Sequence, residues 1–430
     1  MSSDDRIRAG RLARSEIDEN FADLHPPLSR SEALIEADRC YFCYDAPCTT
    51  ACPTGIDIPA FIQKIRSDNI RGSAHTILRE NIMGGMCARV CPTEILCEEA
   101  CVRNTHEEKP VEIGLLQRYA TDPILETGTQ LFERAPSSGK KVAVVGGGPA
   151  GLSCAHRLSM LGHDIVIFNR DAKAGGLNEY GIAAYKTVND FAQKEIDYIL
   201  AIGGIELKNA SPLAAEDGLA MLCKKFDAVF VGIGLADSNE LGIDGEDLDG
   251  VENAIEYIAT LRQAEDKSTL PVGRNVVVIG GGMTAIDVAV QSKRLGAENV
   301  HMVYRRGPEQ MSASVFEQAL AQTSGVRIHY HASPRRIVGN GHVTAVEFAE
   351  GLKLDADIVF KAIGQKLNAD GYGALEQETG RIKVDGHHRT SMPGVWAGGD
   401  CVAGGEDLTV SAVQHGKIAA IDIDRALRKN

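Results

Sequence analysis

The sequence predicts an α/β protein in which a helical, cysteine-rich N-terminal domain precedes two Rossmann-like dinucleotide-binding domains. Two observations carry this prediction. Eight of the eleven cysteines fall between Cys40 and Cys101, in a segment with amphipathic helical runs and no alternating strand pattern. After it, a pattern of apolar strand, glycine turn, helix and second strand occurs twice, first at Gly146 and again 134 residues later at Gly280. This pattern is typical of a βαβ unit.

Composition narrows the class of protein. The chain is 44% hydrophobic and 24% charged and contains 45 glycines. This composition is typical of a globular protein, and the high glycine content suggests tight turns near ligands. The net charge of −14 disfavours nucleic acid and anionic membranes as partners. The sequence shows no apolar signal region and no run of about 18 uncharged apolar residues. We therefore expect a cytoplasmic protein that binds neither membrane nor nucleic acid.

The N-terminal cysteines form two groups. The first is a C-x2-C-x4-C-x3-C-P run at Cys40, Cys43, Cys48 and Cys52, and the second contains Cys87, Cys91, Cys97 and Cys101. Reduced thiols in the cytosol argue against a disulfide framework. Zinc is the alternative reading of such spacings, but two Cys-Pro signals beside two dinucleotide domains favour iron–sulfur clusters. In two-cluster proteins the cysteine before proline serves the other cluster, which here is Cys52.

The first glycine turn follows a linker at residues 133–141. Gly146, Gly148 and Gly151 form G-x-G-x-x-G between a strand and a helix, which lets backbone N–H groups approach a pyrophosphate. A purely structural glycine turn is the alternative, but the strand on either side favours a dinucleotide site. Asn169 stands where an acidic residue usually accepts the ribose hydroxyls, and an amide can still form that hydrogen bond.

The second glycine turn contains Gly280, Gly282 and Ala285, which form G-x-G-x-x-A. Arg305 and Arg306 follow the second strand of this unit, where an acidic residue would select NAD. They predict either a clamp for the 2′-phosphate of NADP or a pair of solvated arginines. The choice between NAD and NADP stays open.

The C-terminal run VWAGGDCVAGGEDLTVSAVQHGKIAA resembles the FAD motif of flavoproteins with two dinucleotide domains. The matching positions are Gly399, Asp400, Thr409 and Val410. This resemblance implies that FAD binds the first glycine turn, where Gly176 is a further predicted contact, and that NAD or NADP binds the second. The FAD domain is then split by the NAD(P) domain. The predicted ranges are 1–138 (cluster domain), 139–240 and 366–430 (FAD domain) and 241–365 (NAD(P) domain).

No catalytic side chain is predicted. Hydride transfer from nicotinamide to flavin requires only that the two rings are positioned. Related flavoproteins reduce disulfides with a C-x-x-C pair, but Cys154, Cys223 and Cys401 are far apart in the sequence. Electrons are therefore expected to leave through the N-terminal cysteine groups.

The whole chain resembles the flavin and iron–sulfur subunit of bacterial NAD(P)-dependent dihydropyrimidine dehydrogenase, and also the small subunit of glutamate synthase. Gln117 favours the dehydrogenase, which uses a glutamine as a cluster ligand where glutamate synthase has glutamate. The resemblance assigns one [4Fe–4S] cluster to Cys40, Cys43, Cys48 and Cys101. It assigns the second to Cys52, Cys91, Cys97 and Gln117. Cys87 receives no ligand role. Met283 departs from the usual residue before Thr284, which is still predicted to contact NAD(P).

The resemblance also implies a function. The chain would transfer hydride between NAD(P)H and FAD and relay electrons through its clusters to a partner subunit that carries FMN and iron–sulfur clusters. That partner would interconvert uracil or thymine and 5,6-dihydropyrimidines, in a hetero-oligomer expected to be a heterotetramer. Two alternatives are a glutamate synthase small subunit and a general NAD(P)H-dependent electron adaptor for another redox partner.

Overall fold

The computed structural model describes residues 6–213 and 218–429, and the chain divides into two compact units. We name each unit after its central strand. The β2 unit comprises residues 25–179, 189–236 and 366–429, and the β9 unit comprises residues 6–24, 180–188 and 237–365. Each unit contains one parallel five-stranded sheet, so the predicted fold class is confirmed. The four domain ranges stay a prediction. Among the described helices, none is both long and apolar enough to cross a membrane.

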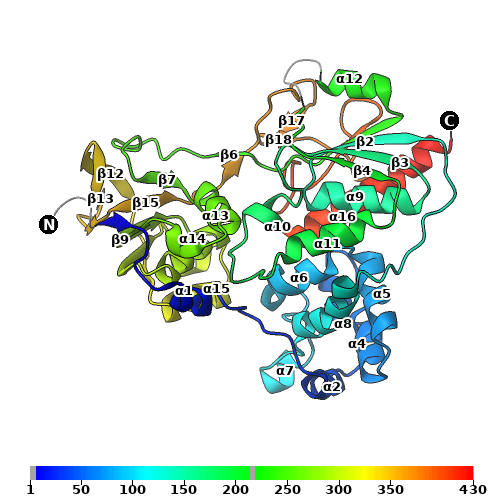
Figure 1. The fold of residues 1–430 in the computed structure, drawn as a ribbon, viewed down its shortest axis with the longest axis horizontal. Coiled ribbons are helices and arrows are strands. Elements are labelled where there is room, and N and C mark those ends of the chain that lie inside the picture. Colours follow the sequence, from blue (N-terminus) through cyan, green and yellow to red (C-terminus); the bar gives the residue numbers. More distant parts are fainter. Residues whose placement is uncertain (1–5, 214–217, 430) are drawn as a thin grey trace. The chain divides into compact units, whose positions relative to one another are not determined.

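The N-terminal part of the β2 unit is helical (Figure 1). Side chains cap several of these helices: Ser29 and Glu32 form a reciprocal capping box, and Asp57 and Asn69 accept N–H groups of the helices that follow them. The apolar faces meet in a core around Phe61, which is fully buried. The helices are α2 (Arg30–Asp38), α3 (Pro47–Ala51), α4 (Ile58–Arg66), α5 (Ile70–Glu80), α6 (Gly84–Val90), α7 (Asn104–Glu107) and α8 (Ile113–Thr127), with a 3-10 turn η2 (Thr93–Ile95).

The sheet of the β2 unit has the strand order β19-β5-β2-β3-β4, and all its pairs are parallel. Strands β5 and β19 are buried along their whole length, and β2 is buried after Lys141, as apolar runs such as AVFV predict. The strands are β2 (Lys141–Val145), β3 (Asp164–Phe168), β4 (Ile205–Lys208), β5 (Ala228–Val231) and β19 (Val395–Ala397), with a hairpin of β17 (Gln377–Glu378) and β18 (Arg381–Ile382). The helices are α9 (Pro149–Met160), α10 (Leu177–Tyr180), α11 (Phe191–Leu200), α12 (Gly218–Lys225) and α16 (Thr409–Leu427).

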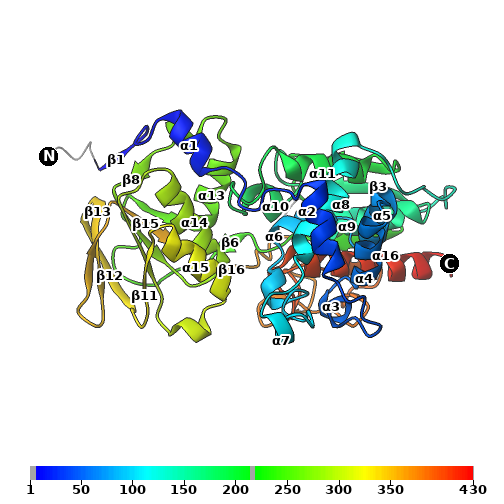
Figure 2. The ribbon, with the colours of Figure 1, turned by 90° about the horizontal axis from the view of Figure 1, so that it is seen from below.

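Helices α9 and α16 pack against each other although 249 residues separate their last and first residues in the sequence (Figure 2). Their backbones approach closely at Gly416, where an added Cβ would lie 2.2 Å from the carbonyl oxygen of Ala150. The Ser153 hydroxyl donates to the carbonyl oxygen of Val413 at 2.8 Å. This contact joins the C-terminal helix to the helix that follows the first glycine turn.

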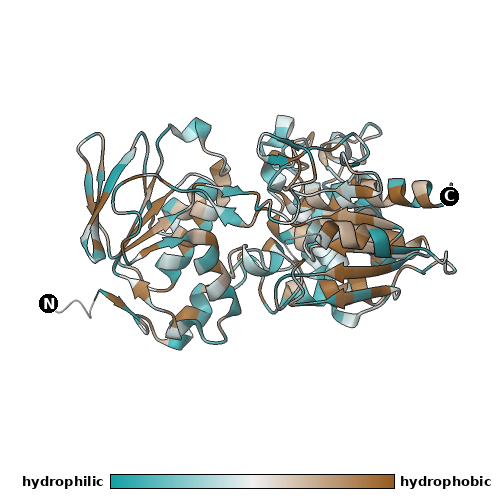
Figure 3. Ribbon diagram, turned by 90° about the horizontal axis from the view of Figure 1, so that it is seen from above, coloured by the Kyte–Doolittle hydropathy of each residue, from teal (hydrophilic) through white to brown (hydrophobic). Residues whose placement is uncertain are grey.

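The sheet of the β9 unit has the order β11-β10-β9-β15-β7, and its pairs are parallel. A three-stranded antiparallel meander accompanies it, and apolar residues follow the strands (Figure 3). The strands are β1 (Ile7–Arg8), β6 (Asp237–Ser238), β7 (Val251–Asn253), β8 (Val272–Gly273), β9 (Asn275–Ile279), β10 (Asn299–Val303), β11 (Arg327–His329), β12 (Pro334–Asn340), β13 (His342–Phe348), β14 (Lys353–Asp355) and β15 (Ile358–Lys361), and β16 (Gln365–Lys366) follows at the boundary. The helices are α1 (Arg14–Asn20), α13 (Ala254–Gln263), α14 (Met283–Arg294) and α15 (Val315–Thr323), with 3-10 turns η3 (Lys267–Thr269) and η4 (Pro308–Gln310).

Both glycine turns follow the central strand of their sheet. Strand β2 lies between β3 and β5, and β9 lies between β10 and β15. The chain therefore leaves each central strand where neighbouring connections run in opposite directions, which is where open α/β sheets bind ligands. The fold places both predicted dinucleotide sites at such a point.

Candidate cofactor sites

The first glycine turn leaves no room for side chains on its inner side. A Cβ at Gly146, whose φ is +103°, would lie 2.2 Å from the carbonyl oxygen of Gly232. A Cβ at Gly151 would lie 2.0 Å from the carbonyl oxygen of Gly146. Gly148 is different, because a Cβ there would meet only the Cα of Gly176, at 3.9 Å. The turn is thus closed toward the protein and bare at the start of α9, as a pyrophosphate site requires.

The structure brings Gly176 to this turn. Gly176 has a φ of +54°, and a Cβ added to it would lie 3.0 Å from the Cα of Gly148. The positive φ and the close approach therefore favour glycine at 176, whereas a Cβ at Gly148 would make only an ordinary van der Waals contact.

The side chain of Asn169, which follows β3, forms hydrogen bonds within the protein. Its Oδ1 accepts the N–H of Gly147 at 3.3 Å, while its amide nitrogen donates to Asp171, Lys173 and Asn209 at 2.9–3.0 Å. Asn169 therefore holds the glycine turn in place, and its contact with a ribose stays a prediction.

The C-terminal motif lies beside the same turn. A Cβ at Gly399, whose φ is +91°, would approach Ala150 of α9 to 3.3 Å. Asp400 follows it, and burial together with Asp407 raises the pKa of Asp400 to about 6. Thr409 and Val410 open helix α16. The Thr409 hydroxyl lies 2.6 Å from Oδ1 of Asn178. The structure thus gathers all the predicted FAD positions around the N-terminus of α9 and the start of α16.

The second glycine turn repeats this arrangement in the β9 unit. A Cβ at Gly280 would lie 2.1 Å from the carbonyl oxygen of Ala362, and Ala285 is fully buried against the sheet. Gly282 precedes α14, and a Cβ there would meet only the Ser312 hydroxyl, at 3.2 Å. Met283 and Thr284 form the first turn of α14 and are half-buried. The bare backbone fits a second dinucleotide.

Arg305 and Arg306 follow β10 beside this turn, and both side chains are exposed. Within the described residues, neither guanidinium forms an ion pair. The preceding Tyr304 packs its ring over Gly281, where a Cβ would lie 2.4 Å from the ring. Its hydroxyl donates to the carbonyl oxygen of Gln310 at 2.6 Å. Tyr304 therefore fixes the backbone from which the two unpaired cations extend.

Four cysteines surround one pocket in the cysteine-rich part of the β2 unit. Cys40, Cys43, Cys48 and Cys101 line it together with apolar side chains that include Ile58, Ile62, Val111 and Ile113. Burial raises the pKa of Cys40, and it raises the pKa of Cys48 to about 11. Thiols that resist ionisation in this apolar environment become thiolates when a metal replaces their protons. The donor set fits an iron–sulfur cluster.

The other four N-terminal cysteines form a second group, which contains Cys52, Cys87, Cys91 and Cys97. A hydrogen bond with Cys87 and burial raise the pKa of the Cys91 thiol, and the nearby sulfurs of Cys97 and Cys52 raise it further. The pKa of Cys97 is raised by burial, with Glu98 and Cys52 adding to the effect. The structure therefore brings Cys52 to the cysteines of the second motif, and it places Cys87 among them.

Gln117 lies on α8, which packs against α6. The side chain is buried, and its amide nitrogen donates to the carbonyl oxygen of Gly84 at 2.6 Å. Because a carbonyl can only accept, the amide oxygen is the atom that Gln117 can offer to a metal. Cys91 directly follows the end of α6.

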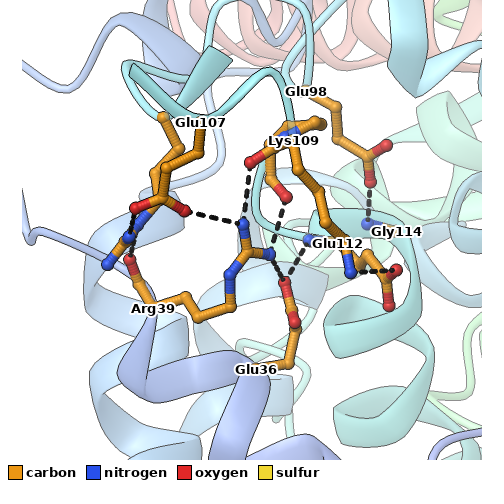
Figure 4. A network of polar contacts seen from close by, with 9 residues as sticks. Glu36, Arg39, Glu98, Glu107, Lys109, Glu112 and Gly114 are labelled. Carbon is orange, nitrogen blue, oxygen red and sulfur yellow. Dashed lines mark hydrogen bonds and ion pairs between the residues drawn. The ribbon is translucent and has the colours of Figure 1, made fainter. Parts of the chain in front are cut away.

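A network of polar contacts joins the segment before Cys40 to the segment after Cys101 (Figure 4). Arg39, directly before Cys40, donates to Glu36 at 2.5 Å and to the carbonyl oxygens of Lys109 and Pro110 at 2.7 and 2.8 Å. Glu36 in turn accepts the N–H of Glu112 at 2.9 Å. The network holds the Cys40 loop against the segment that follows Cys101.

Within residues 6–213 and 218–429, no three His, Cys, Asp or Glu side chains are close enough to share a single metal ion. In a [4Fe–4S] cluster each iron takes its own protein ligand, so the ligands surround the cluster and do not meet at one point.

Comparisons with known proteins agree with this geometry. Residues 140–416 match the family described as pyridine nucleotide-disulphide oxidoreductase, and residues 17–129 match dihydropyrimidine dehydrogenase domain II, 4Fe-4S cluster. A homolog of the NAD-dependent dihydropyrimidine dehydrogenase subunit PreT from Salmonella typhi is 34% identical over 414 residues, which cover 96% of this chain and 98% of that protein. The chain belongs to the PreT family.

Two further comparisons concern one relative in sequence and one likeness in fold. The glutamate synthase [NADPH] small chain of Escherichia coli K12 is 33% identical over 442 aligned positions, which cover 93% of this chain and 92% of that protein. The crystal structure of Lactococcus lactis thioredoxin reductase covers 68% of this chain and all of its own, with a TM-score of 0.55 and 20% identity. The second likeness concerns the fold alone. The predicted family resemblance is confirmed, and this PreT-family chain is an NAD(P)-dependent oxidoreductase with flavin and iron–sulfur binding domains.

Sequence reasoning missed three residues around the first glycine turn of this PreT-family chain. Asn178 contacts Thr409, as described above. The N–H of Gly399 donates to Nδ1 of His415 at 3.2 Å, and His415 stacks on His388 with 4.3 Å between ring centroids. No spacing rule predicts such contacts, because each joins segments that are distant or irregularly spaced in the sequence.

Proposed function

We propose that the chain is the electron-input subunit of a dihydropyrimidine dehydrogenase. In this proposal NAD(P)H gives hydride to FAD, and electrons pass through two [4Fe–4S] clusters to a partner subunit. The partner carries FMN and interconverts uracil or thymine and the 5,6-dihydropyrimidine. The proposal is supported by one observation above all: one compact unit combines a flavin-type glycine cradle with two separate groups of cysteines.

Each group of residues has a role in this proposal. Bound FAD would supply the conversion of a two-electron hydride into single electrons. The bare backbone of Gly148 and the N-terminus of α9 accept the pyrophosphate charge. Cys40, Cys43, Cys48 and Cys101 hold one cluster, and the second is held by Cys52, Cys91, Cys97 and Gln117. The apolar pocket walls keep water away from the first cluster.

The pyrimidine chemistry is assigned to the partner because this chain accounts for hydride and electron transfer alone. The relatives named PreT are described as subunits, which supports a hetero-oligomer. We infer a heterotetramer of two such chains and two partners, in the cytoplasm.

The test is reconstitution. We expect the anaerobically purified chain to oxidise NADH or NADPH with ferricyanide as acceptor, and to show no uracil reduction. Addition of an FMN-containing partner encoded beside it should restore NAD(P)H-dependent uracil reduction. Uracil turnover by this chain alone would refute the division of labour.

A glutamate synthase small subunit is the second candidate, favoured by the 33% identity noted above. Gln117 speaks against it, because glutamate synthase is expected to have glutamate at that position. Copurification with a large amidotransferase subunit, and NADPH-dependent glutamate formation from glutamine and 2-oxoglutarate, would establish this candidate in place of the first. A third possibility, a general electron adaptor, would be indicated by equal reduction of unrelated ferredoxins without either partner.

A further inference from the structure

Lys417 connects the C-terminal helix α16 to the cysteine-rich segment within the β2 unit. Its ammonium nitrogen donates to the carbonyl oxygen of Thr54 at 2.8 Å, to the carbonyl oxygen of Glu80 at 3.0 Å and to the Glu80 carboxylate at 3.1 Å. The side chain is only 10% exposed. Because an ammonium has three N–H donors, all of them are used in this contact.

One acceptor of Lys417, the Thr54 carbonyl, belongs to the loop that carries Cys52, and the other two belong to Glu80. Thr54 lies two residues after Cys52 and is buried, and its hydroxyl oxygen lies 3.3 Å from the Cys52 sulfur. Glu80 ends helix α5. Burial lowers the pKa of Lys417, while Glu80 and the Cys52 sulfur act in the opposite direction. The Lys417 ammonium is therefore linked to Cys52 through a single residue, Thr54, which contacts both side chains.

The first residues of α16 lie at the proposed FAD site. Thr409 and Val410 open this helix, and Gly416, directly before Lys417, allows its backbone to touch α9. Helix α9 follows the first glycine turn. A single helix, whose backbone touches α9 at Gly416, thus runs from the proposed FAD site to Lys417 beside the Cys52 loop.

The charges around this contact are mostly positive. Arg157 of α9 donates to the carbonyl oxygen of Arg79 at 2.5 Å, and Arg79 pairs with Glu80 at 3.1 Å. Three cations, Lys417, Arg157 and Arg79, therefore face one carboxylate. Reduction adds one negative charge to a cluster, and the potential of a cluster depends on nearby charge. A buried cation stabilises the added charge more than an exposed one.

We propose that Lys417 is a positioning residue that holds the Cys52 loop against the flavin-side helix and favours the reduced state of the cluster bound by Cys52. The inference rests on the proposed function, since it needs FAD at the first glycine turn and a cluster at Cys52. In the step concerned, one electron leaves the flavin and one enters the cluster, and no other reactant takes part.

The experiment compares K417Q, K417R and the wild-type chain, each purified anaerobically with its cofactors. A matched control is K353Q, which removes a half-exposed lysine of β14 in the β9 unit. Dithionite titration followed by electron paramagnetic resonance measures the reduction of each cluster, and iron and flavin are measured in parallel.

We expect K417Q to reduce the ratio of reduced to oxidised Cys52 cluster about tenfold at a fixed potential, a shift of about 59 mV to lower potential for one electron. K417R and K353Q should titrate like the wild type. Loss of about half the iron in K417Q, with flavin retained and with iron restored in K417R, would equally support the role of Lys417 in holding the loop.

The proposal is overturned if K417Q keeps its iron and titrates like the wild type. It is also overturned if K417R is as defective as K417Q, because the charge would then not be the property that matters. Failure of the proposed function is recognised separately, since the wild-type chain would then lack flavin or iron, or would not oxidise NAD(P)H.

Discussion

At the scale of single residues, the first glycine turn makes a sharp prediction. In G151A the new methyl group would lie 2.0 Å from the carbonyl oxygen of Gly146, a backbone atom that cannot move away cheaply. We expect flavin affinity to fall at least about tenfold, which is roughly 1.4 kcal/mol. Flavin content after gel filtration measures it. The control is G386A, where an added Cβ meets nothing within 4 Å; equal flavin loss in both variants would contradict the assignment.

Arg305 and Arg306 allow a test of the predicted 2′-phosphate clamp. If they bind the 2′-phosphate of NADPH, the double variant R305Q/R306Q should raise the KM for NADPH about tenfold and change that for NADH less than about twofold. Steady-state oxidation of both cofactors with ferricyanide measures this. R335Q removes another exposed arginine of the same unit as a control. A similar loss for both cofactors would mean that the pair is only solvated.

Glu195 predicts a dependence of stability on pH. This residue of α11 is fully buried and accepts the N–H groups of Gly85 and Met86 at 2.9 and 3.0 Å. Burial, only partly offset by these hydrogen bonds and by Arg89, raises its pKa to about 8. The folded state therefore keeps a proton that the unfolded chain loses near pH 4.3. Stability should fall as the pH rises between about 4 and 8, by up to about 1.4 kcal/mol per pH unit.

The variant E195Q removes this titration but keeps an oxygen that can accept both N–H groups. We expect its advantage in melting temperature over the wild type to be larger at pH 7.5 than at pH 5.5, measured by thermal denaturation under argon. The control E206Q changes an exposed glutamate of β4. A difference between E195Q and wild type that does not vary with pH would show that Glu195 is not protonated in the folded protein.

At the scale of elements, the loops around the first cysteine group depend on Arg39. Its guanidinium links α2 to the segment after Cys101 through Glu36, Lys109 and Pro110. R39M leaves these acceptors unpaired, at a cost of about 1.5–3 kcal/mol. We therefore expect iron to be lost about tenfold faster on exposure to a chelator, with flavin retained, as absorbance and iron analysis can show.

The control for this element is R30M, which removes an exposed arginine that pairs with Asp68 at the surface. Such an exposed ion pair contributes little to stability. Equal rates of iron loss in R39M and R30M would mean that the network does not hold the cluster loops.

At the scale of the whole molecule, the two cysteine groups predict a fixed stoichiometry. We expect about eight iron atoms, about eight labile sulfides and about one FAD per chain. C101S should lose about half of the iron, whereas C223S, which changes a cysteine of α12 outside both groups, should lose none. Metal analysis and flavin release measure these ratios. An anaerobic preparation that contains zinc in place of iron would contradict the ligand sets.

The sequence by itself determined the fold class, the two glycine turns and the presence of metal-binding thiols. These features are local: a turn that must leave its backbone bare needs glycine at set positions, and ligands on a short loop need close spacing. Gly146, Gly280 and the run from Cys40 to Cys52 can be read for that reason without knowledge of distant contacts.

Only the tertiary structure decided which distant residues support the sites. The family resemblance already grouped Cys101 with Cys40 and Gly176 with the first glycine turn, and the structure brings these residues together. The hydrogen bonds of Asn169 to the glycine turn and of Lys417 to Thr54, 363 positions apart in the sequence, come from the structure alone. Such pairs depend on how helices and sheets pack, because burial and hydrogen bonding between segments far apart in the sequence leave no periodic pattern in either segment. Candidate cofactor-binding residues can be listed from the sequence, but the residues that hold these candidates in place cannot.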